Sequence, residues 1–143
     1  MSHLDTIQQM YAAFVRGDVP AILAHLDDDV VWEYGIKSTD VPWLEPRRGR
    51  AAVTGFFESL AALIEWHRFE PKTFFEQGTT VVVLLDGEFT VKTTGRRVLQ
   101  EDGIHIWHLN GAGKVVRFCH RVDTYQYWVA WSGTGQPLIE SAS

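Results

Sequence analysis

The segment Gly103–Asp123, with the sequence GIHIWHLNGAGKVVRFCHRVD, constrains the fold more than any other part of the chain. It predicts two strands joined by an Asn-Gly-Ala-Gly turn, because these turn residues tolerate a positive φ. If Leu109 pairs with Lys114 across the turn, His105 lies opposite Phe118. The segment therefore predicts a hairpin with a defined register.

Side chains alternate between the two faces of a strand, so this hairpin has one aromatic face and one mixed face. His120 is expected diagonally from His105, with about 7–8 Å between the two Cα atoms. The first face carries His105, Trp107, Phe118, His120 and Val122, and the other carries Ile104, Ile106, His108, Arg117, Cys119 and Arg121. Two titratable rings between aromatic walls indicate a binding or reaction pocket.

Length and charge narrow the class of protein. A chain of 143 residues is long enough for one domain with a substantial core. The formal net charge is −5 and the basic residues cluster only at Arg47, Arg48 and Arg50, which disfavours a nucleic-acid partner. No apolar run approaches the ~20 residues that span a membrane, and the single Cys119 excludes an internal disulfide. We expect a cytoplasmic protein.

The spacing of apolar residues predicts three helices in the first half of the chain. They cover residues 3–16, a short segment from Asp18 to Asp27–Asp29, and Arg50–Ile64, with a loop at 35–48. Strands are expected at residues 30–34, 66–76, 79–92, 97–109 and 114–123, with a bulge near Gly103. Residues 124–131 are expected to be irregular, which gives one domain at residues 1–131 and a flexible tail at 132–143.

Helices followed by a long antiparallel meander indicate an α+β fold, with the helices packed on one face of a curved, mainly antiparallel sheet. The opposite sheet face also carries apolar residues, including Val82, Leu84, Ile104 and Ile106. An open sheet with such a face exposes an apolar patch. We therefore expect a second copy of the chain to cover it and form a homodimer.

The chain resembles the NTF2-like superfamily, and within it the SnoaL-like polyketide cyclases and the ketosteroid isomerases. Four segments spread over nearly the whole chain carry this resemblance: Ile7–Asp18 running into Ile22–Trp32, the helix start Arg48–Val53, the turn Asn110–Val116, and Val122–Thr124. The resemblance implies a cone of three helices on a curved sheet around one deep pocket, commonly in a dimer formed through the outer sheet face. None of the four segments is a catalytic motif, so the chemistry has to be argued from the pocket.

The catalytic residues of these relatives are mostly replaced here. A tyrosine in the first helix of the ketosteroid isomerases aligns with Met10, beside Tyr11, and their general-base aspartate aligns with Tyr34. Their protonated aspartate aligns with His105, and an aspartate that the limonene-epoxide hydrolases carry on the last strand aligns with His120. Steroid isomerisation by the mechanism of these relatives is therefore not expected.

His120 and His105 are the leading catalytic candidates, because both occupy positions where relatives place a reacting group and imidazole titrates near neutral pH. The alternative is that the two rings only hydrogen-bond each other, or Tyr34, inside an apolar cavity. Tyr34, expected to face the pocket together with Trp32, is either a donor to a substrate oxygen or a core tyrosine. Six aromatic residues are expected to bind the substrate and exclude water: Trp32, Trp43, Phe57, Phe89, Trp107 and Phe118.

A zinc site is not expected. His105, His108, Cys119 and His120 offer four zinc ligands within a short span. Strand alternation puts two of them on each face, fewer than the three or four ligands that zinc sites need. We therefore expect neither a metal nor another cofactor.

The favoured hypothesis is an enzyme that acts on a small, apolar, ring-containing molecule by general acid/base chemistry, as an isomerase, cyclase or dehydratase. His120 would be the base or acid, His105 would polarise a carbonyl group, and Tyr34 would orient the substrate. The alternative is a dimeric module that binds such a molecule without transforming it. A third hypothesis is a structural dimerisation domain whose cone is filled by side chains.

Overall fold

The computed structural model describes residues 1–33 and 39–139. Its helices are α1 (His3–Arg16), α2 (Val19–Leu23), α3 (Arg50–Leu63) and α4 (Thr124–Ser132), with a 3₁₀ turn η1 (Pro42–Leu44). Its strands are β1 (Leu26–Trp32), β2 (Arg47–Arg48), β3 (Ile64–Gln77), β4 (Thr80–Val91), β5 (Arg97–Leu109) and β6 (Val115–Arg121). Within the described ranges, no helix is long and apolar enough to cross a membrane.

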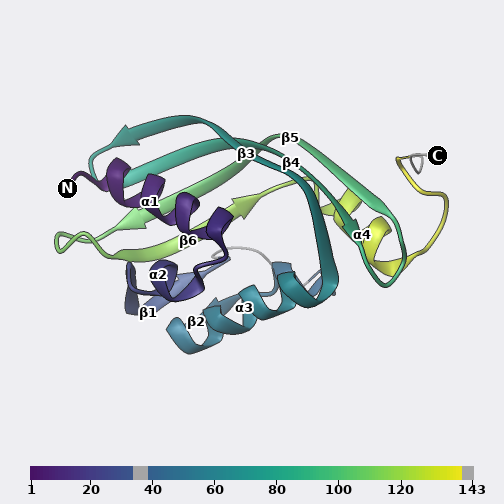
Figure 1. Cartoon of the computed structure of the whole chain (residues 1–143), viewed down its shortest axis with the longest axis horizontal. Coiled ribbons are helices and arrows are strands. Elements are labelled where there is room, and N and C mark those ends of the chain that lie inside the picture. Colours follow the sequence, from purple (N-terminus) through teal and green to yellow (C-terminus); the bar gives the residue numbers. More distant parts are fainter. Residues whose placement is uncertain (34–38, 140–143) are drawn as a thin grey trace.

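The strands form one curved, open sheet in the order β2-β1-β6-β5-β4-β3. Neighbouring strands are antiparallel except for the parallel pair β1–β6. Helices α1, α2 and α3 lie on one side of the sheet, and α4 packs near its far end against β5 (Figure 1). The predicted α+β fold, with helices on a curved and mainly antiparallel sheet, is confirmed.

Several elements differ from the predicted ones; the predicted loop at 35–48, for example, contains η1 and β2. Helix α2 ends at Leu23 and β1 begins at Leu26, so Asp27–Asp29 lie in a strand and do not end the helix. Residues 124–132 form helix α4, although they were predicted to be irregular. The Asp123 side chain caps this helix by accepting from the Gln126 N–H at 3.1 Å. Cap and burial together outweigh the weak helix propensity of its aromatic residues.

The chain after α4 starts as an anchored segment. Ser132 belongs to α4, and the Arg96 guanidinium donates to the carbonyl oxygens of Thr134 and Gly135 at 3.0 and 2.7 Å. The predicted tail at 132–143 therefore begins with one residue of α4 and then contains two residues whose carbonyl groups accept hydrogen bonds from Arg96. Residues 140–143 lie outside the described residues.

The β5–β6 hairpin pairs His105 directly with His120. The predicted pairing of Leu109 with Lys114 was wrong, because Leu109 pairs with Val115 and a bulge then shifts the register by one further residue. A shift of one residue reverses the two faces of a strand, but two successive shifts restore them. The predicted faces are therefore correct, while the two histidines lie opposite each other instead of diagonally.

A bulge interrupts the β4–β5 pairing at the predicted position. Between the pairs Leu85–Gly103 and Gly87–Gln100, β4 contributes one residue and β5 contributes two. One of these two, Asp102, has a φ of 52°. The Gln100 side chain folds over Gly103, where any Cβ would overlap it. The bulge and the glycine therefore allow the Gln100 amide to lie inside the molecule.

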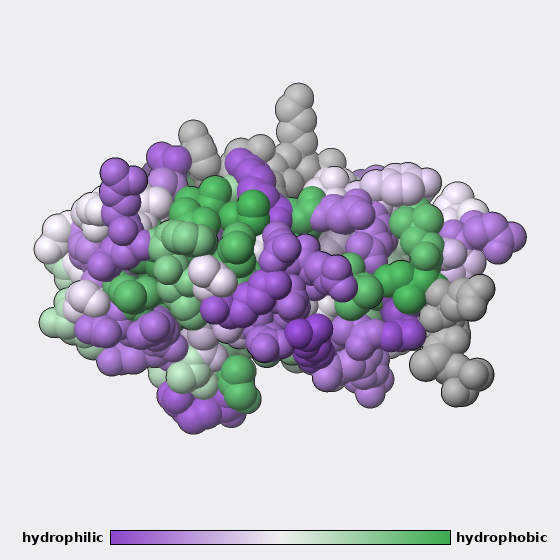
Figure 2. Space-filling view, turned by 90° about the horizontal axis from the view of Figure 1, so that it is seen from above, coloured by the Kyte–Doolittle hydropathy of each residue, from purple (hydrophilic) through white to green (hydrophobic). Residues whose placement is uncertain are grey.

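The molecular surface mixes polar and apolar side chains. Seen from above the view of Figure 1, apolar side chains form clusters separated by polar ones (Figure 2). On the outer face of the sheet, Cys119 is buried while Ile104 and Ile106 are half-buried. The apolar character predicted for this face is thus present in the folded chain.

Gly103→Ala should destabilise the fold by about 1–3 kcal/mol, because the added Cβ must push the Gln100 side chain away from its partner Tyr127. Urea denaturation measures this change. Gly111→Ala is the matched control, since a Cβ at that position meets no atom within 4 Å. Adding Gln100→Ala to Gly103→Ala should recover part of the loss. If Gly103→Ala and Gly111→Ala were equally stable, the overlap between the added Cβ and the Gln100 side chain would be contradicted.

Candidate functional site

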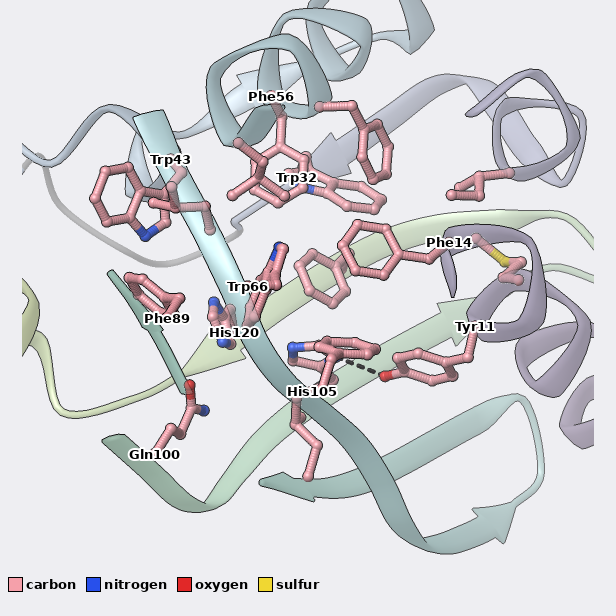
Figure 3. A pocket seen from close by; sticks show the side chains of 18 of the residues that line it. Tyr11, Phe14, Trp32, Trp43, Phe56, Trp66, Phe89, Gln100, His105 and His120 are labelled. Atoms are coloured by element: carbon pink, nitrogen blue, oxygen red, sulfur yellow. Dashed lines mark hydrogen bonds between the residues drawn. The ribbon is translucent and has the colours of Figure 1, made fainter. Parts of the chain in front are cut away.

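A cavity lies between the helices and the inner face of the sheet (Figure 3). Its volume is about 70 Å³, and about 680 Å³ of space lies between its walls when adjoining solvent is included. Aromatic rings dominate the lining: the six predicted residues Trp32, Trp43, Phe57, Phe89, Trp107 and Phe118, together with Tyr11, Phe14, Phe56, Trp66, Phe69 and Tyr127. The predicted aromatic wall is therefore assembled around one space.

Tyr11 of α1 reaches across the cavity to β5 (Figure 3). Its hydroxyl oxygen lies 2.5 Å from His105 Nδ1, and Trp107 Nε1 donates to the same oxygen at 3.0 Å. An indole N–H only donates, so the Tyr11 oxygen accepts from Trp107 and its own proton is available for His105. In this arrangement His105 carries its proton on Nε2, where it can donate to a ligand.

Burial keeps this network uncharged. Burial, and secondly the nearby His120, holds the pKa of His105 well below its ordinary value. Burial also raises the pKa of the Tyr11 hydroxyl, against the opposing effect of the hydrogen bond from Trp107. Both groups are therefore neutral near pH 7 and act as hydrogen-bond donors and acceptors.

His120 of β6 faces His105 across the paired strands, with 4.6 Å between the ring centroids. Burial lowers the pKa of His120 to about 3. Its Nδ1 lies 3.8 Å from Oε1 of Glu33, which does not belong to the cavity lining. His120 therefore stands between the cavity and a carboxyl group behind it, which is how a general base is commonly oriented in enzymes.

Glu33 is a fully buried carboxyl group, with 0% of its side chain exposed. Within the described residues neither of its oxygens makes a hydrogen bond of normal geometry, and the His120 backbone N–H is only near enough to act on its pKa. Burial raises the pKa of Glu33 well above its ordinary value, although the His120 backbone N–H, Arg121 and Arg47 oppose this shift. Burying a carboxylate without a partner costs free energy. The Glu33–His120 pair therefore strongly favours states in which a proton neutralises the carboxyl group.

The backbone at Glu33 explains why strand alternation did not point to it. Strand β1 ends at Trp32, and Glu33 then adopts a φ of 63°, which is uncommon outside glycine. Alternation stops where the strand stops, so the side chain after Trp32 turns back toward β6. Strained, buried residues of this kind cluster at functional sites.

Gln100 and Tyr127 supply the remaining polar groups of the lining. The Tyr127 hydroxyl donates to Gln100 Oε1 at 2.6 Å, which joins α4 to the bulge of β5. Gln100 is 8% exposed, and its Nε2 has no hydrogen-bond partner within the described residues. Among the described lining residues, Gln100 Nε2 and the Nε1 atoms of Trp32 and Trp43 are therefore buried donors that a ligand could satisfy.

The candidate residues from the sequence have different outcomes. His105 and His120 both line the cavity, while Tyr34 lies outside the described residues, and the catalytic roles of all three stay predictions. Sequence reasoning assigned no role to Tyr11 or Glu33. Tyr11 lies in the apolar stripe of the first helix. A buried tyrosine hydroxyl needs a hydrogen-bond partner, so the sequence already indicated that Tyr11 bonds another polar group.

The arrangement of ligating side chains does not suggest a metal centre. Within residues 1–33 and 39–139, no group of three or more His, Cys, Asp or Glu side chains is placed to hold a metal ion. His105 and His120 share the inner face, whereas His108 and Cys119 lie on the other face of their strands. The chemistry available to the cavity is therefore that of imidazole, carboxyl, phenol and amide groups.

Several solved structures share this fold. An NTF2-like protein of unknown function from Burkholderia pseudomallei is 29% identical, with a TM-score of 0.79 over 91% of this chain and 98% of that one. TerC, co-crystallised with polyporic acid, is 24% identical, with a TM-score of 0.76 over 91% and 98% of the two chains. A candidate polyketide cyclase from Xanthomonas campestris pv. campestris is 20% identical, with a TM-score of 0.69 over 90% and 95%. The last two show likeness of fold alone.

The comparison with curated proteins gave no match. The family model of the SnoaL-like domain matches residues 7–118, which run from the first helix into the last strand of the sheet. This stretch contains Tyr11, Glu33 and His105, and it ends two residues before His120. The chain therefore belongs to the SnoaL-like domain family within the NTF2-like superfamily.

Proposed function

We propose that this protein is an acid/base enzyme that acts, without a cofactor, on a small ring-containing carbonyl compound, as an isomerase, cyclase or dehydratase. One observation carries the proposal: a buried Glu33–His120 pair lies beside the neutral donor His105 in the wall of a cavity lined by aromatic rings. Solved structures of the same fold include a candidate polyketide cyclase, which is compatible with this class of reaction.

The Glu33–His120 pair is proposed as the general base. A proton on a carbon next to the substrate carbonyl moves to His120 Nε2, while His120 Nδ1 passes its proton to Glu33 Oε1. The step starts from the ionised form of Glu33, which burial disfavours. The transfer neutralises this buried carboxylate, which compensates for the weak basicity of a histidine whose pKa is lowered to about 3. The present 3.8 Å between Nδ1 and Oε1 has to shorten to a hydrogen bond in the complex.

His105 is proposed to stabilise the negative charge that the carbonyl oxygen acquires. The electron pair of the broken C–H bond moves to this oxygen, and His105 Nε2–H donates to it. Trp107 and Tyr11 hold His105 in the required tautomer from the other side of the ring. Tyr34 is proposed to orient the substrate. Return of the proton to another carbon gives an isomerase, attack on a second carbonyl gives a cyclase, and loss of water gives a dehydratase.

A binding module that transforms nothing is the second candidate function. The cavity lining favours it in one respect, because the lining residues include no carboxylate and both histidines are neutral. In this case the polar groups would only orient a bound ring compound. Polyporic acid is a reasonable first ligand to test, since TerC with the same fold was co-crystallised with it.

We also propose that the outer sheet face joins two copies of the chain. Ile104 and Ile106 lie half-buried on this face beside the buried Cys119, and an apolar sheet face is commonly covered by a partner. A symmetric dimer would bring the same strands of both copies together.

His120→Asn should lower the rate of proton exchange at carbon by about 10²–10⁴-fold, because it removes the base while keeping a polar side chain of similar size. Exchange of the α-protons of 2-tetralone in D₂O, followed by NMR, measures this rate. His105→Asn should cost less, and its effect should not add independently to that of His120→Asn. His67→Asn, at an exposed position, is the control. Exchange at the wild-type rate in both cavity variants would leave the binding module as the function.

Glu33→Gln should raise the Tm relative to the wild type, and this gain should be at least about 2 °C larger at pH 8 than at pH 5. The folded state holds the pKa of Glu33 above its ordinary value, so the wild type loses stability as pH rises from about 4.5 through the higher folded pKa. Gln removes this loss, although His120, Arg121 and Arg47 still face the position. Thermal unfolding followed by circular dichroism measures both Tm values. The exposed Glu58→Gln is the control, and equal gains at both pH values would contradict the raised pKa.

Ile106→Asp should convert the proposed dimer to a monomer, because an unpaired charge buried in an interface costs several kcal/mol. Sedimentation velocity at micromolar concentration measures the assembly state. Val15→Asp, which places the same charge at an exposed position of α1, should leave the dimer intact. A wild-type protein that sediments as a monomer would rule the dimer out.

A further inference from the structure

A second cavity, here called the outer chamber, lies beside the bulge of β5. Its wall is formed by residues 99–103 of β5, residues 121–123 after β6, and Gln126 and Tyr127 of α4. Its volume is about 390 Å³, compared with about 70 Å³ for the aromatic cavity, here called the inner pocket. The outer chamber therefore has room for a polar ligand group, and its exposed lining residues Glu101, Asp102 and Asp123 open it to solvent.

Gln100 and Tyr127 form a wall that the two cavities share. Both residues line the inner pocket and the outer chamber, and they are 8% and 1% exposed. The 2.6 Å hydrogen bond from the Tyr127 hydroxyl to Gln100 Oε1 closes this wall. Helix α4 is held against β5 independently, because the Gln126 side chain bonds both backbone groups of Leu99. Gln100 and Tyr127 are therefore the side chains that separate the two cavities.

The shared wall contains a buried polar atom without a partner. Gln100 Nε2 makes no hydrogen bond within the described part of the chain. Reversing the amide would not help, because Tyr127 would then face the nitrogen and Oε1 would be left without a partner. Native proteins rarely leave such an atom unsatisfied, so its presence at a cavity wall points to a ligand group that bonds it.

The charges around the outer chamber indicate which ligand group fits. Glu101, Asp102 and Asp123 bring three carboxyl groups to its wall, against one guanidinium from Arg121 in the wall and the Lys72 ammonium, which pairs with Asp102 at 2.7 Å. The carboxyl groups repel an anion and accept from hydroxyl groups, whereas the Gln100 amide donates to an oxygen. A neutral hydroxyl or carbonyl group satisfies both kinds of partner.

We propose that the outer chamber binds the hydroxyl- or carbonyl-bearing end of the ligand whose ring occupies the inner pocket, with Gln100 and Tyr127 as the contacts that select it. This inference rests on the proposed function in one respect, which is that the inner pocket holds a ring. On binding, the ligand oxygen accepts from Gln100 Nε2, and rotation of the Gln100 and Tyr127 side chains opens the wall between the cavities. The enzyme then distinguishes oxygen-bearing ring compounds from plain ones at residues other than the proposed base.

Three matched compounds test this selection: 2-ethylnaphthalene, 2-naphthaleneethanol and 2-naphthylacetate. Tryptophan fluorescence quenching gives their dissociation constants, since Trp32 and Trp107 line the inner pocket. The wild type should bind the alcohol most tightly and the anion most weakly. Gln100→Leu should weaken binding of the alcohol about tenfold and change that of 2-ethylnaphthalene by less than about threefold. Gln77→Leu, at an exposed position of β3, is the control.

Tyr127→Phe keeps the ring and removes the hydroxyl, so it tests the wall even if Gln100→Leu does not fold. It should also change the affinity for the alcohol more than that for 2-ethylnaphthalene. Equal losses for all three compounds, or an alcohol bound no better than 2-ethylnaphthalene, would overturn the proposal and leave the acid/base function intact. If the wild type binds none of the compounds, both proposals fail. Loss of proton exchange in His120→Asn with unchanged binding constants would support both.

Discussion

The cross-strand pairing of His105 with His120 is the interaction on which the rest of the site depends. It places two imidazoles 4.6 Å apart on the inner face of the sheet, where bulky aromatic rings exclude water. Each ring then needs a partner behind it, because a buried polar group without one is costly. Tyr11 of the first helix meets that need for His105, and the carboxyl group of Glu33, just after β1, lies 3.8 Å from His120 Nδ1. One strand pair therefore brings together residues from three separate parts of the chain.

Burial gives these groups a common electrostatic state. The pKa of His105 and the pKa of His120 are both lowered, whereas the pKa of Glu33 is raised, in each case chiefly because the charged form loses its water. Burial thus favours the neutral form of each group, and a proton that a substrate releases is drawn toward the Glu33–His120 pair when Glu33 is ionised. This arrangement differs from the single aspartate that serves as the general base in the ketosteroid isomerases, which the chain resembles.

Sequence reasoning was most successful where periodicity and burial agree. The order of helices and strands, the two faces of the β5–β6 hairpin and the bulge near Gly103 follow from local patterns that the folded chain keeps. The hairpin register was wrong by two residues, yet the faces were right because the strand period is two. The last helix was missed. Its cap at Asp123 is a local signal, but the burial that also supports the helix depends on distant segments and cannot be read from local sequence.

The sequence by itself determined the family, the aromatic wall and the two histidines, because these depend on residue type and on strand alternation. Only the tertiary structure decided which groups stand behind those histidines. Glu33 turns inward because β1 ends one residue earlier and its backbone takes a φ of 63°, and no periodic pattern encodes that turn. The contact between Gln100 and Tyr127 joins residues 27 positions apart through a bulge and a helix cap. Such contacts arise from packing between distant segments, which local propensities do not specify.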